Sequence, residues 1–239
     1  MFITYKKTKV NYEIVGDGQT DIVFLHGWGG NINSFKFLCK HLTFSFRAMF
    51  IDFPPFGKSG ELKQPLTIYD YAEMVERIVK KEKFRNYIFV GHSFGGRVSL
   101  ILSNNKDVKK LVLIDSAGLK PKRSLMYYIK VYSYKLIKKL GIKVNAGSKD
   151  YRNLSPVMKK TFVNIVNTNL EKYAKMIKIP TLIIWGKKDK DTPMYMAKKL
   201  NKLINNSNLI VFSNAKHFSY IDNLPIFVNV LNNFCENKL

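Results

Sequence analysis

Cysteine is nearly absent from this chain of 239 residues, which contains only Cys39 and Cys235. Both lie in apolar stretches with a helical pattern, so we expect buried, free thiols. So few cysteines exclude a small fold that is held together by disulfides, and they are typical of a reducing compartment. We therefore expect a cytoplasmic protein.

Long apolar runs are missing as well. No segment of about 18 or more apolar residues occurs, which excludes the pattern of a membrane-spanning helix. Residues 1–7 lead into strand-like sequence without the pattern of a signal peptide. The chain nevertheless has 46% hydrophobic and 13% aromatic residues, enough to bury one large core with a small insertion. We expect a soluble, unexported protein with one such core.

Acidic residues are scarce. The chain has 17 Asp and Glu against 40 Lys and Arg, and its formal net charge of +23 is far more than solubility requires. Residues 119–178 hold fifteen of the basic residues but only two acids, Asp150 and Glu171. Such a basic surface attracts an anionic substrate, an acidic carrier protein or a membrane surface, although a codon bias toward lysine would also explain it. No nucleic-acid-binding motif occurs, so we do not expect nucleic acid as a partner.

Apolar runs alternate with helical patterns along most of the chain. The apolar runs are almost free of polar residues, as in strands covered on both faces, and occupy residues 21–25, 47–51, 86–90, 110–114, 180–185 and 208–212. Helical patterns occupy residues 34–42, 67–82, 94–104, 194–204 and 225–234. Thr67 is the expected cap of its helix. This alternation predicts an α/β protein with a mostly parallel, doubly wound sheet.

One segment interrupts the alternation. Residues 119–178 contain no convincing strand, and stretches such as 124–140 and 155–167 have a helical pattern. The first stretch carries one apolar stripe at steps of four, three, four and four residues, formed by Leu125, Ile129, Tyr132, Leu136 and Leu140. An insertion at the carboxyl edge of the sheet would roof whatever lies there. We predict a helical cap at 119–178 between core segments 1–118 and 179–239, with a substrate pocket lined by Leu125, Ile129 and Tyr132.

The sequence VGHSFGG, residues 90–96, places a serine between two glycines where an apolar run meets a helical pattern. The spacing Gly91-x-Ser93-x-Gly95 allows a strand to reverse so tightly into a helix that the serine adopts a strained conformation. A Cβ at either glycine would collide with a neighbouring element. A serine held in this way stands clear of the sheet edge as a nucleophile, whereas the simpler interpretation is an ordinary turn.

A nucleophilic serine needs a histidine that accepts its proton. Four histidines are present. His92 adjoins the serine and should point elsewhere, His41 lies in the pattern of a surface helix, and His26 precedes a glycine-rich loop. His217 directly follows the last apolar run, which makes it our candidate for the base. A lone histidine after a strand is more often structural, so the assignment depends on the complete set of partners.

The carboxylate that orients the histidine should follow an earlier strand at the same edge. The sequence WGKKDKDTP, residues 185–193, offers Asp189 as our choice and Asp191 as its rival. Asp191 or Thr192 would also suit as the cap of the helix that begins near residue 193, which leaves Asp189 free. Asp115, at the end of another apolar run, is a third and weaker candidate.

Two backbone N–H groups should stabilise the oxyanion that forms when the serine attacks. The residue after the serine, Phe94, supplies one group, and Trp28 in the loop HGWGG, residues 26–30, is the expected second donor. The glycines of that loop are also compatible with a plain turn. Histidine and cysteine do not cluster at ligand spacing, and no phosphate-binding glycine motif occurs. We therefore expect neither a metal nor a cofactor.

Four motifs in the order HGWGG, GHSFGG, WGKKD and AKHF resemble the α/β-hydrolase superfamily, specifically its serine hydrolases with a helical cap. The resemblance runs from about residue 11 to residue 235 and implies an α/β-hydrolase fold. It implies a catalytic triad of Ser93, Asp189 and His217, with an oxyanion hole formed by Trp28 and Phe94. The sequence departs from the superfamily in a loop that borders the pocket, where a proline replaces the usual glycine at position 55.

A serine at this turn points to acyl-group chemistry. The expected function is that of an intracellular serine hydrolase, carboxylesterase-like, which cleaves an ester through an acyl-enzyme intermediate. A thioester or a carbon–carbon bond flanked by a ketone are alternative substrates, because one architecture supports many reactions. A hypothesis of another class is a non-catalytic binding module that uses the basic cap as its working surface.

Overall fold

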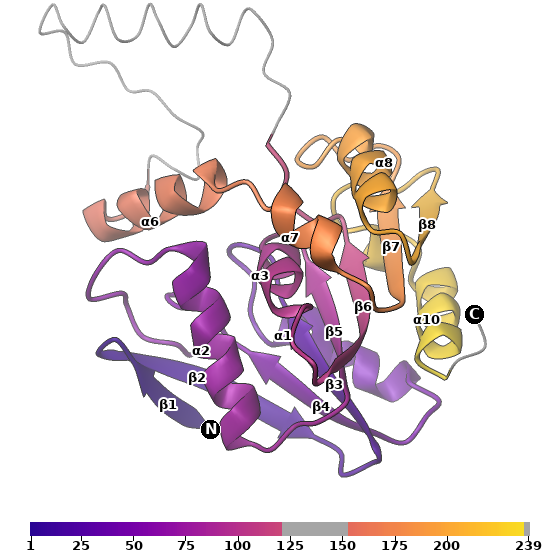
Figure 1. Ribbon diagram of the computed structural model, residues 1–239. Helices are drawn as coiled ribbons and strands as arrows, with labels where there is room; N and C mark the ends of the chain where they lie inside the picture. Colours follow the sequence, from indigo (N-terminus) through magenta and orange to yellow (C-terminus); the bar gives the residue numbers. More distant parts are fainter. Residues whose placement is uncertain (121–152, 237–239) are drawn as a thin grey trace, which may run out of the picture.

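The structure is a computed structural model that describes residues 1–120 and 153–236 (Figure 1). Its centre is an eight-stranded sheet of order β1-β2-β4-β3-β5-β6-β7-β8. The strands are β1 (Phe2–Tyr5), β2 (Thr8–Val15), β3 (Thr20–Leu25), β4 (Phe46–Ile51), β5 (Tyr87–His92), β6 (Val108–Ile114), β7 (Thr181–Gly186) and β8 (Ser207–Phe212). From β4 to β8 in this order, all neighbouring strands pair in parallel. β1 pairs antiparallel with β2, and β2 pairs antiparallel with β4. The predicted α/β class with a mostly parallel sheet is confirmed.

The six apolar runs all form strands, with ends that differ from the prediction by no more than two residues. Their side chains alternate between two apolar clusters, one on each face of the sheet: Val23 belongs to one cluster, and Ile22 and Phe24 belong to the other. The inner strands have no solvent side, which is why their runs lack the polar alternation of a half-exposed strand. The edge strand β8 differs, because Asn208 and Val211 are exposed. The strand-like amino terminus forms the antiparallel pair β1 and β2 at one edge.

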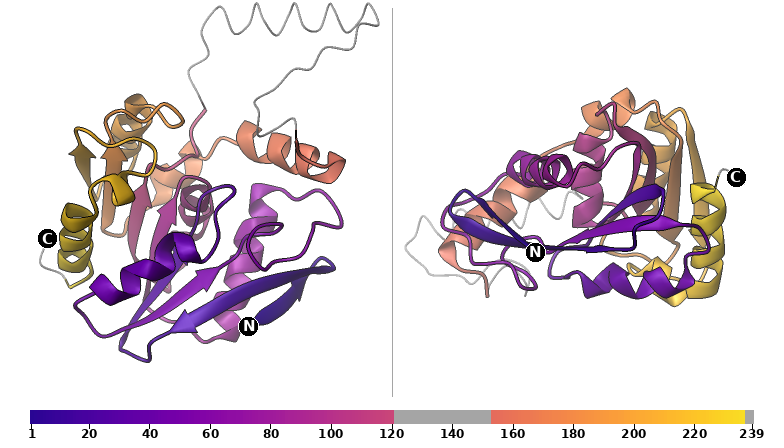
Figure 2. Two further views of the ribbon diagram at one scale, coloured as in Figure 1. Left: turned by 180° about the vertical axis from the view of Figure 1, so that it is seen from behind. Right: turned by 90° about the horizontal axis from the view of Figure 1, so that it is seen from below.

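Helices cover both faces of the sheet, and the view from below shows the sheet between two helical layers (Figure 2). The described helices are α1 (Asn33–Lys36), the 3₁₀ helix η1 (Phe37–His41), α2 (Ile68–Lys81), α3 (Phe94–Leu102), α6 (Pro156–Asn167), α7 (Glu171–Met176), α8 (Met194–Leu203), α9 (Ser219–Asp222) and α10 (Leu224–Cys235). Within residues 1–120 and 153–236, none of them combines the length and apolar character that crossing a bilayer demands.

Two details of the helices bear on the sequence predictions. Thr67 caps α2 as predicted: its hydroxyl accepts a hydrogen bond from the Asp70 N–H, and the Asp70 carboxylate accepts one from the Thr67 N–H at 2.6 Å. The single helix expected at 34–42 is instead one α-helical turn followed by a 3₁₀ helix. Both cysteines are free; Cys235 is buried, whereas Cys39 is only half-buried.

The predicted cap segment is described only in its flanks. In these flanks α6 begins after Ser155, whose hydroxyl caps the helix by accepting from the Met158 N–H, and both α6 and α7 bury apolar residues in the cluster that covers the sheet. Thr161 of α6 is fully buried and accepts a hydrogen bond from the Leu66 N–H at 3.0 Å. The stripe residues, including the predicted pocket residues, lie outside the described residues: Leu125, Ile129, Tyr132, Leu136 and Leu140.

Candidate active site

Ser93 lies at the sharp turn between β5 and α3. Its backbone has φ 49° and ψ −106°, a conformation that costs a non-glycine residue about 1–3 kcal/mol. Added side chains at the flanking glycines would collide with their surroundings: a Cβ at Gly95 would lie 1.9 Å from the Leu25 carbonyl oxygen, and one at Gly91 would lie 2.5 Å from Ser99 Oγ. The close approach of these elements therefore requires glycine at both positions and forces the strain onto the serine between them.

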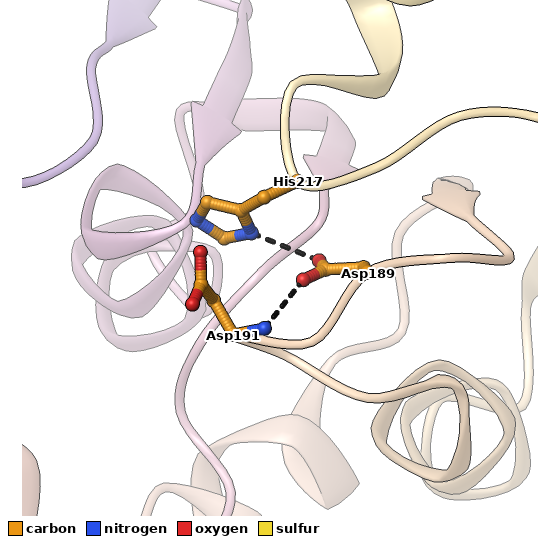
Figure 3. A group of neighbouring side chains, drawn as sticks. All are labelled: Asp189, Asp191 and His217. Atoms are coloured by element: carbon orange, nitrogen blue, oxygen red, sulfur yellow. Dashed lines mark hydrogen bonds and ion pairs between the residues drawn. The ribbon is translucent and has the colours of Figure 1, made fainter.

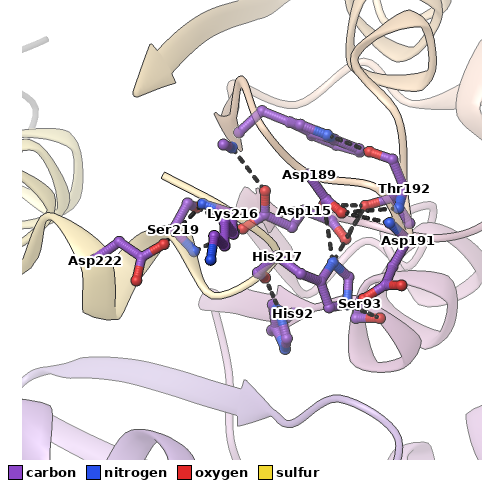
Figure 4. A network of polar contacts seen from close by, with 12 residues as sticks. His92, Ser93, Asp115, Asp189, Asp191, Thr192, Lys216, His217, Ser219 and Asp222 are labelled. Carbon is purple, nitrogen blue, oxygen red and sulfur yellow. Dashed lines mark hydrogen bonds and ion pairs between the residues drawn. The ribbon is translucent and has the colours of Figure 1, made fainter. Parts of the chain in front are cut away.

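The parallel sheet brings Ser93, His217 and Asp189 to one edge. Ser93 follows β5, Asp189 follows β7 and His217 follows β8, and the carboxyl ends of parallel strands meet at the same side of the sheet. His217 Nε2 lies 3.0 Å from Ser93 Oγ, and His217 Nδ1 lies 2.8 Å from Asp189 Oδ2 (Figure 4). The structure therefore places three residues that are far apart in the sequence in one hydrogen-bonded chain.

Asp189 is far better held than its rival Asp191. Its side chain is buried, and besides His217 it accepts hydrogen bonds from the N–H groups of Asp191 and Thr192 and from the Thr192 hydroxyl, at 2.8, 3.0 and 2.6 Å. Asp191 is exposed, and its carboxylate bonds to no other described residue. The expectation that Asp191 or Thr192 caps α8 is wrong. The residue at the cap position of α8 is Pro193, whose side chain cannot accept a hydrogen bond. The Thr192 hydroxyl instead donates to Asp189 and lies 3.0 Å from the Asp115 carbonyl oxygen.

The three side chains Asp189, Asp191 and His217 also have potential ligand atoms within 4.8 Å of one another (Figure 3). The sequence predicts no metal here. The hydrogen bonds already join Asp189 to one nitrogen of His217 and Ser93 to the other, so the histidine has a partner on each side. This is the geometry that proton transfer from a serine requires.

Asp115 supports the site without contacting the imidazole. It is fully buried at the end of β6. Its carboxylate accepts from the Gly186 N–H at 2.8 Å and from the N–H and hydroxyl of Ser219 at 3.1 and 2.5 Å. These contacts connect the loop that carries Asp189 to the loop that carries His217. As a direct partner of His217, Asp115 is therefore a weaker candidate than Asp189, as the sequence indicates.

The charges around His217 adjust its protonation. Burial lowers the pKa of His217, but its hydrogen bond to Asp189 and the nearby carboxylates outweigh this and raise the pKa above its ordinary value of 6.5. Burial raises the pKa of Asp189, and the hydrogen bonds from His217 and Thr192 outweigh it and hold that pKa below the usual range. Near neutral pH, Asp189 is therefore an anion that stabilises a proton on His217.

The other two buried histidines hold loops of the site. His92 Nε2 donates to the His217 carbonyl oxygen at 2.8 Å, and burial lowers the pKa of His92 to about 3. His26 Nε2 accepts from the Phe53 N–H at 2.9 Å, its Nδ1 donates to the Gly27 carbonyl oxygen at 2.7 Å, and burial lowers its pKa to about 4. Both rings are neutral and engaged with the backbone, so neither faces the serine as a base. The sequence excludes them as the base but does not indicate these roles.

The predicted oxyanion donors lie beside Ser93. A Cβ at Gly27 would lie 3.4 Å from Ser93 Cβ, so the loop that carries Trp28 packs directly against the serine. The backbone N–H groups of Trp28 and Phe94 donate to no acceptor within the described residues, and both residues line the same pocket as Ser93.

A pocket of about 560 Å³ opens above Ser93 and His217. Its walls are mostly apolar, and the described lining residues that the sequence did not single out include Leu119, Phe162, Ile165, Val166, Met196 and Arg97. Arg97 could have been found, because it follows Ser93 by four residues on a predicted helix and must lie on the same face. The others come from α6, from α8 and from the loop after β6, and only the packing of the folded chain shows that they line the pocket.

A mostly parallel α/β sheet with a strained serine at the turn after its central strand defines the architecture of the α/β hydrolases. Residues 21–130 and 143–224 match the family described as alpha/beta hydrolase fold, and the chain belongs to this family. The resemblance read from the four motifs is thereby confirmed for the family and the fold.

Two curated relatives are similar over most of their length. The AB hydrolase superfamily protein YisY of Bacillus subtilis is 27% identical over 88% of this chain and 89% of its own. A pimeloyl-(acyl-carrier protein) methyl ester esterase of Wigglesworthia glossinidia brevipalpis is 25% identical over 94% of this chain and 97% of its own. Among solved structures, an esterase from Exiguobacterium antarcticum has a TM-score of 0.78 at 23% identity and covers 98% of both chains, which shows the shared fold.

Proposed function

We propose that this protein is a serine hydrolase that cleaves a carboxylic ester through an acyl-enzyme intermediate. One observation carries the proposal: Ser93 Oγ, His217 and Asp189 form a continuous chain with contacts of 3.0 and 2.8 Å, and the serine at its head is held at φ 49°. A pure binding module has no need for a strained serine in line with a histidine and a buried carboxylate. The strain is maintained by surrounding packing, as at other functional turns.

The chemistry follows from the geometry. Ser93 Oγ attacks the ester carbonyl carbon while His217 Nε2 takes the hydroxyl proton, and Asp189 stabilises the imidazolium that forms. The negative charge on the carbonyl oxygen is stabilised by the N–H groups of Trp28 and Phe94. His217 then gives its proton to the departing alkoxide, which leaves the acyl group on Ser93. Water deprotonated by His217 attacks the carbonyl carbon of this acyl-enzyme, and His217 then returns the proton to Ser93 Oγ as the bond to the acyl group breaks and the acid is released.

Relatives support an ester as the substrate. Several curated relatives carry the name pimeloyl-(acyl-carrier protein) methyl ester esterase, from Wigglesworthia, Proteus and Yersinia. An ester of an acyl chain, free or bound to a carrier, fits the mostly apolar pocket of about 560 Å³. The proposal includes the helical cap at 119–178 as the roof of this pocket, with Leu125, Ile129 and Tyr132 among its lining. The described end of this segment supports such a roof, because Phe162 and Ile165 of α6 line the pocket.

A covalent probe tests the proposal. A fluorophosphonate should label the wild type once per chain, at Ser93 by peptide mass spectrometry, and Ser93→Ala should remain unlabelled because the attacking oxygen is gone. A panel of p-nitrophenyl esters of graded chain length, measured beside a thioester and a vinylogous diketone, then identifies the bond that is cleaved. Equal labelling of the wild type and Ser93→Ala would refute the proposal.

The pH dependence of kcat/KM follows from the raised pKa of His217. Only neutral His217 can accept the serine proton, so kcat/KM should fall as the pH drops through the pKa of His217 in the free enzyme. Because this pKa is raised, kcat/KM should reach half of its maximum above pH 6.5. Asp189→Asn removes the strongest contact that raises this pKa, so its acid limb should move to lower pH. Asp191→Asn, which removes a nearby charge that makes no hydrogen bond to His217, should shift the limb less. A wild-type midpoint below 6.5 would contradict the assignment.

A further inference from the structure

Arg97 is a cation in the wall of the active-site pocket. It lies in α3 one turn beyond Ser93, and its backbone N–H donates to the Ser93 carbonyl oxygen at 3.3 Å. The residue is only 6% exposed, yet it lines the pocket together with Ser93 and His217. A positive charge is therefore held close to the proposed nucleophile and largely out of water.

Half of the Arg97 guanidinium has a structural role. Nη1 donates to the carbonyl oxygens of Ile165 and Thr168, at 3.0 Å each, and so satisfies backbone groups at the end of α6. Both acceptors are neutral. Within the described residues, no carboxylate pairs with Arg97, and neither Nε nor Nη2 donates to an acceptor. Burial lowers the pKa of Arg97 to about 10, and no neighbouring acid counteracts this effect.

This situation sets Arg97 apart from the other arginines that the structure describes. Each of those is more exposed and has a carboxylate partner; the pairs are Arg47 with Asp21, Arg77 with Glu73 and Arg85 with Asp107. A buried charge without a partner is strongly unfavourable, and proteins normally neutralise it. Arg97 is the exception, because the only partners of its guanidinium among the described residues are two backbone carbonyl oxygens.

The free edge of Arg97 remains open to a ligand. Among the described residues, no side-chain nitrogen or oxygen that is sealed from solvent lacks a hydrogen bond, so Nε and Nη2 are not sealed. Arg97 lines the active-site pocket, which is the hollow that the structure places beside this side chain. Leu119, Phe162 and Val166 line the same pocket and carry no polar side-chain group, so an anion beside Arg97 would face little competition from water.

Arg47 shows what this edge of a guanidinium binds. Its Nε and Nη2 donate to the two oxygens of the Asp21 carboxylate, both at 2.7 Å. The same two atoms are free in Arg97, and the planar pair of donors matches a carboxylate better than it matches a single carbonyl oxygen.

We infer that Arg97 binds a carboxylate on the acyl part of the substrate, so that the preferred substrate is a half-ester of a dicarboxylic acid. The inference deepens the proposed function and rests on it. The ester is held at Ser93 while the far carboxylate pairs with Nε and Nη2 of Arg97. In this role Arg97 determines specificity and takes no part in bond breaking.

The experiment compares the mono-p-nitrophenyl ester of adipic acid with p-nitrophenyl hexanoate, which has the same chain length and no charge. In the wild type, kcat/KM for the half-ester should exceed that for the neutral ester by about 10- to 100-fold, mainly through a lower KM. Arg97→Gln should abolish this ratio, and Arg97→Lys should retain part of it because the charge stays and the paired donors are lost. Arg47→Gln, which changes an arginine outside the pocket, should leave the ratio unchanged.

Several outcomes would overturn the inference. A wild type that hydrolyses both esters equally well has no carboxylate site, and an Arg97→Gln variant that slows both esters alike shows a purely structural arginine. If the wild type preferred a matched ester that ends in a phosphate, Arg97 would bind an anion other than a carboxylate, and the inference would be wrong. Failure to hydrolyse either ester would instead refute the proposed function.

A binding measurement covers the case in which Arg97→Gln does not fold. Calorimetric titration of the Ser93→Ala variant with monomethyl adipate and with methyl hexanoate needs no turnover. Tighter binding of monomethyl adipate, by at least tenfold, is expected, and equal binding of the two esters would overturn the inference.

Discussion

Replacing Ser93 with alanine should lower kcat for a good ester by a factor on the order of 10⁶, with KM little changed. The substitution removes the oxygen of the proposed nucleophile but leaves the pocket and the N–H groups of Trp28 and Phe94, so a small residual rate above that of water should persist. His217→Ala should cost a similar factor. The double variant should be scarcely slower than either single variant, because the two residues act as a unit.

Ser103→Ala is the matched control. Ser103 is a buried serine directly after α3, its hydroxyl donates to the Ser99 carbonyl oxygen at 2.6 Å, and it does not line the pocket. This variant should keep wild-type kcat. Stopped-flow and steady-state assays with one p-nitrophenyl ester measure all four variants. A Ser93→Ala enzyme that keeps a tenth of the wild-type kcat would exclude Ser93 as the nucleophile.

Replacing Asp189 with asparagine should lower kcat by a factor on the order of 10⁴. The asparagine side chain fits the same space but carries no charge, so it no longer stabilises the imidazolium or holds the imidazole in the tautomer that accepts the serine proton. Asp191→Asn should stay within about threefold of the wild type, because the Asp191 side chain is exposed and makes no contact that holds His217.

Thermal unfolding of the same variants separates chemistry from stability. Asp189→Asn should lose activity while it remains folded at the assay temperature, as judged by circular dichroism. A large loss of kcat in Asp191→Asn with normal activity in Asp189→Asn would transfer the role of the acid to Asp191. If Asp115→Asn alone had the 10⁴-fold effect without unfolding, the acid would lie at the end of β6 instead.

Local patterns predicted much of the fold. The apolar runs became β3 to β8 because a strand covered on both faces contains almost no polar residue, and this property is visible in five or six consecutive letters. The cap of α2 was equally visible, since Thr67 and Asp70 are three residues apart. The choice of Asp189 over Asp191 was harder from the sequence, because two residues of loop decide which carboxylate turns inward.

Sequence patterns failed to predict the role of a side chain where a residue distant in the sequence forms its hydrogen bonds. Its position before α8 makes Thr192 suitable as a helix cap. Its hydroxyl instead donates to the Asp189 carboxylate and lies close to the Asp115 carbonyl oxygen. The spacing of four residues from Ser93 indicates that Arg97 lies near the serine, but its burial and its lack of a carboxylate partner among the described residues are visible only in the structure. Neither feature can be read from neighbours in the sequence.

The sequence by itself determined the α/β class, the strained turn at Ser93 and the order of the motifs, because these can be read from short local patterns and from their order along the chain. The tertiary structure decided how these pieces meet. The 3.0 Å contact between Ser93 and His217 joins residues 124 positions apart, and it exists because parallel pairing aligns the carboxyl ends of β5, β7 and β8. The same packing brings the end of α6 to Arg97 of α3 and leaves this buried arginine in the pocket wall, since burial and pairing depend on what the folded chain brings together.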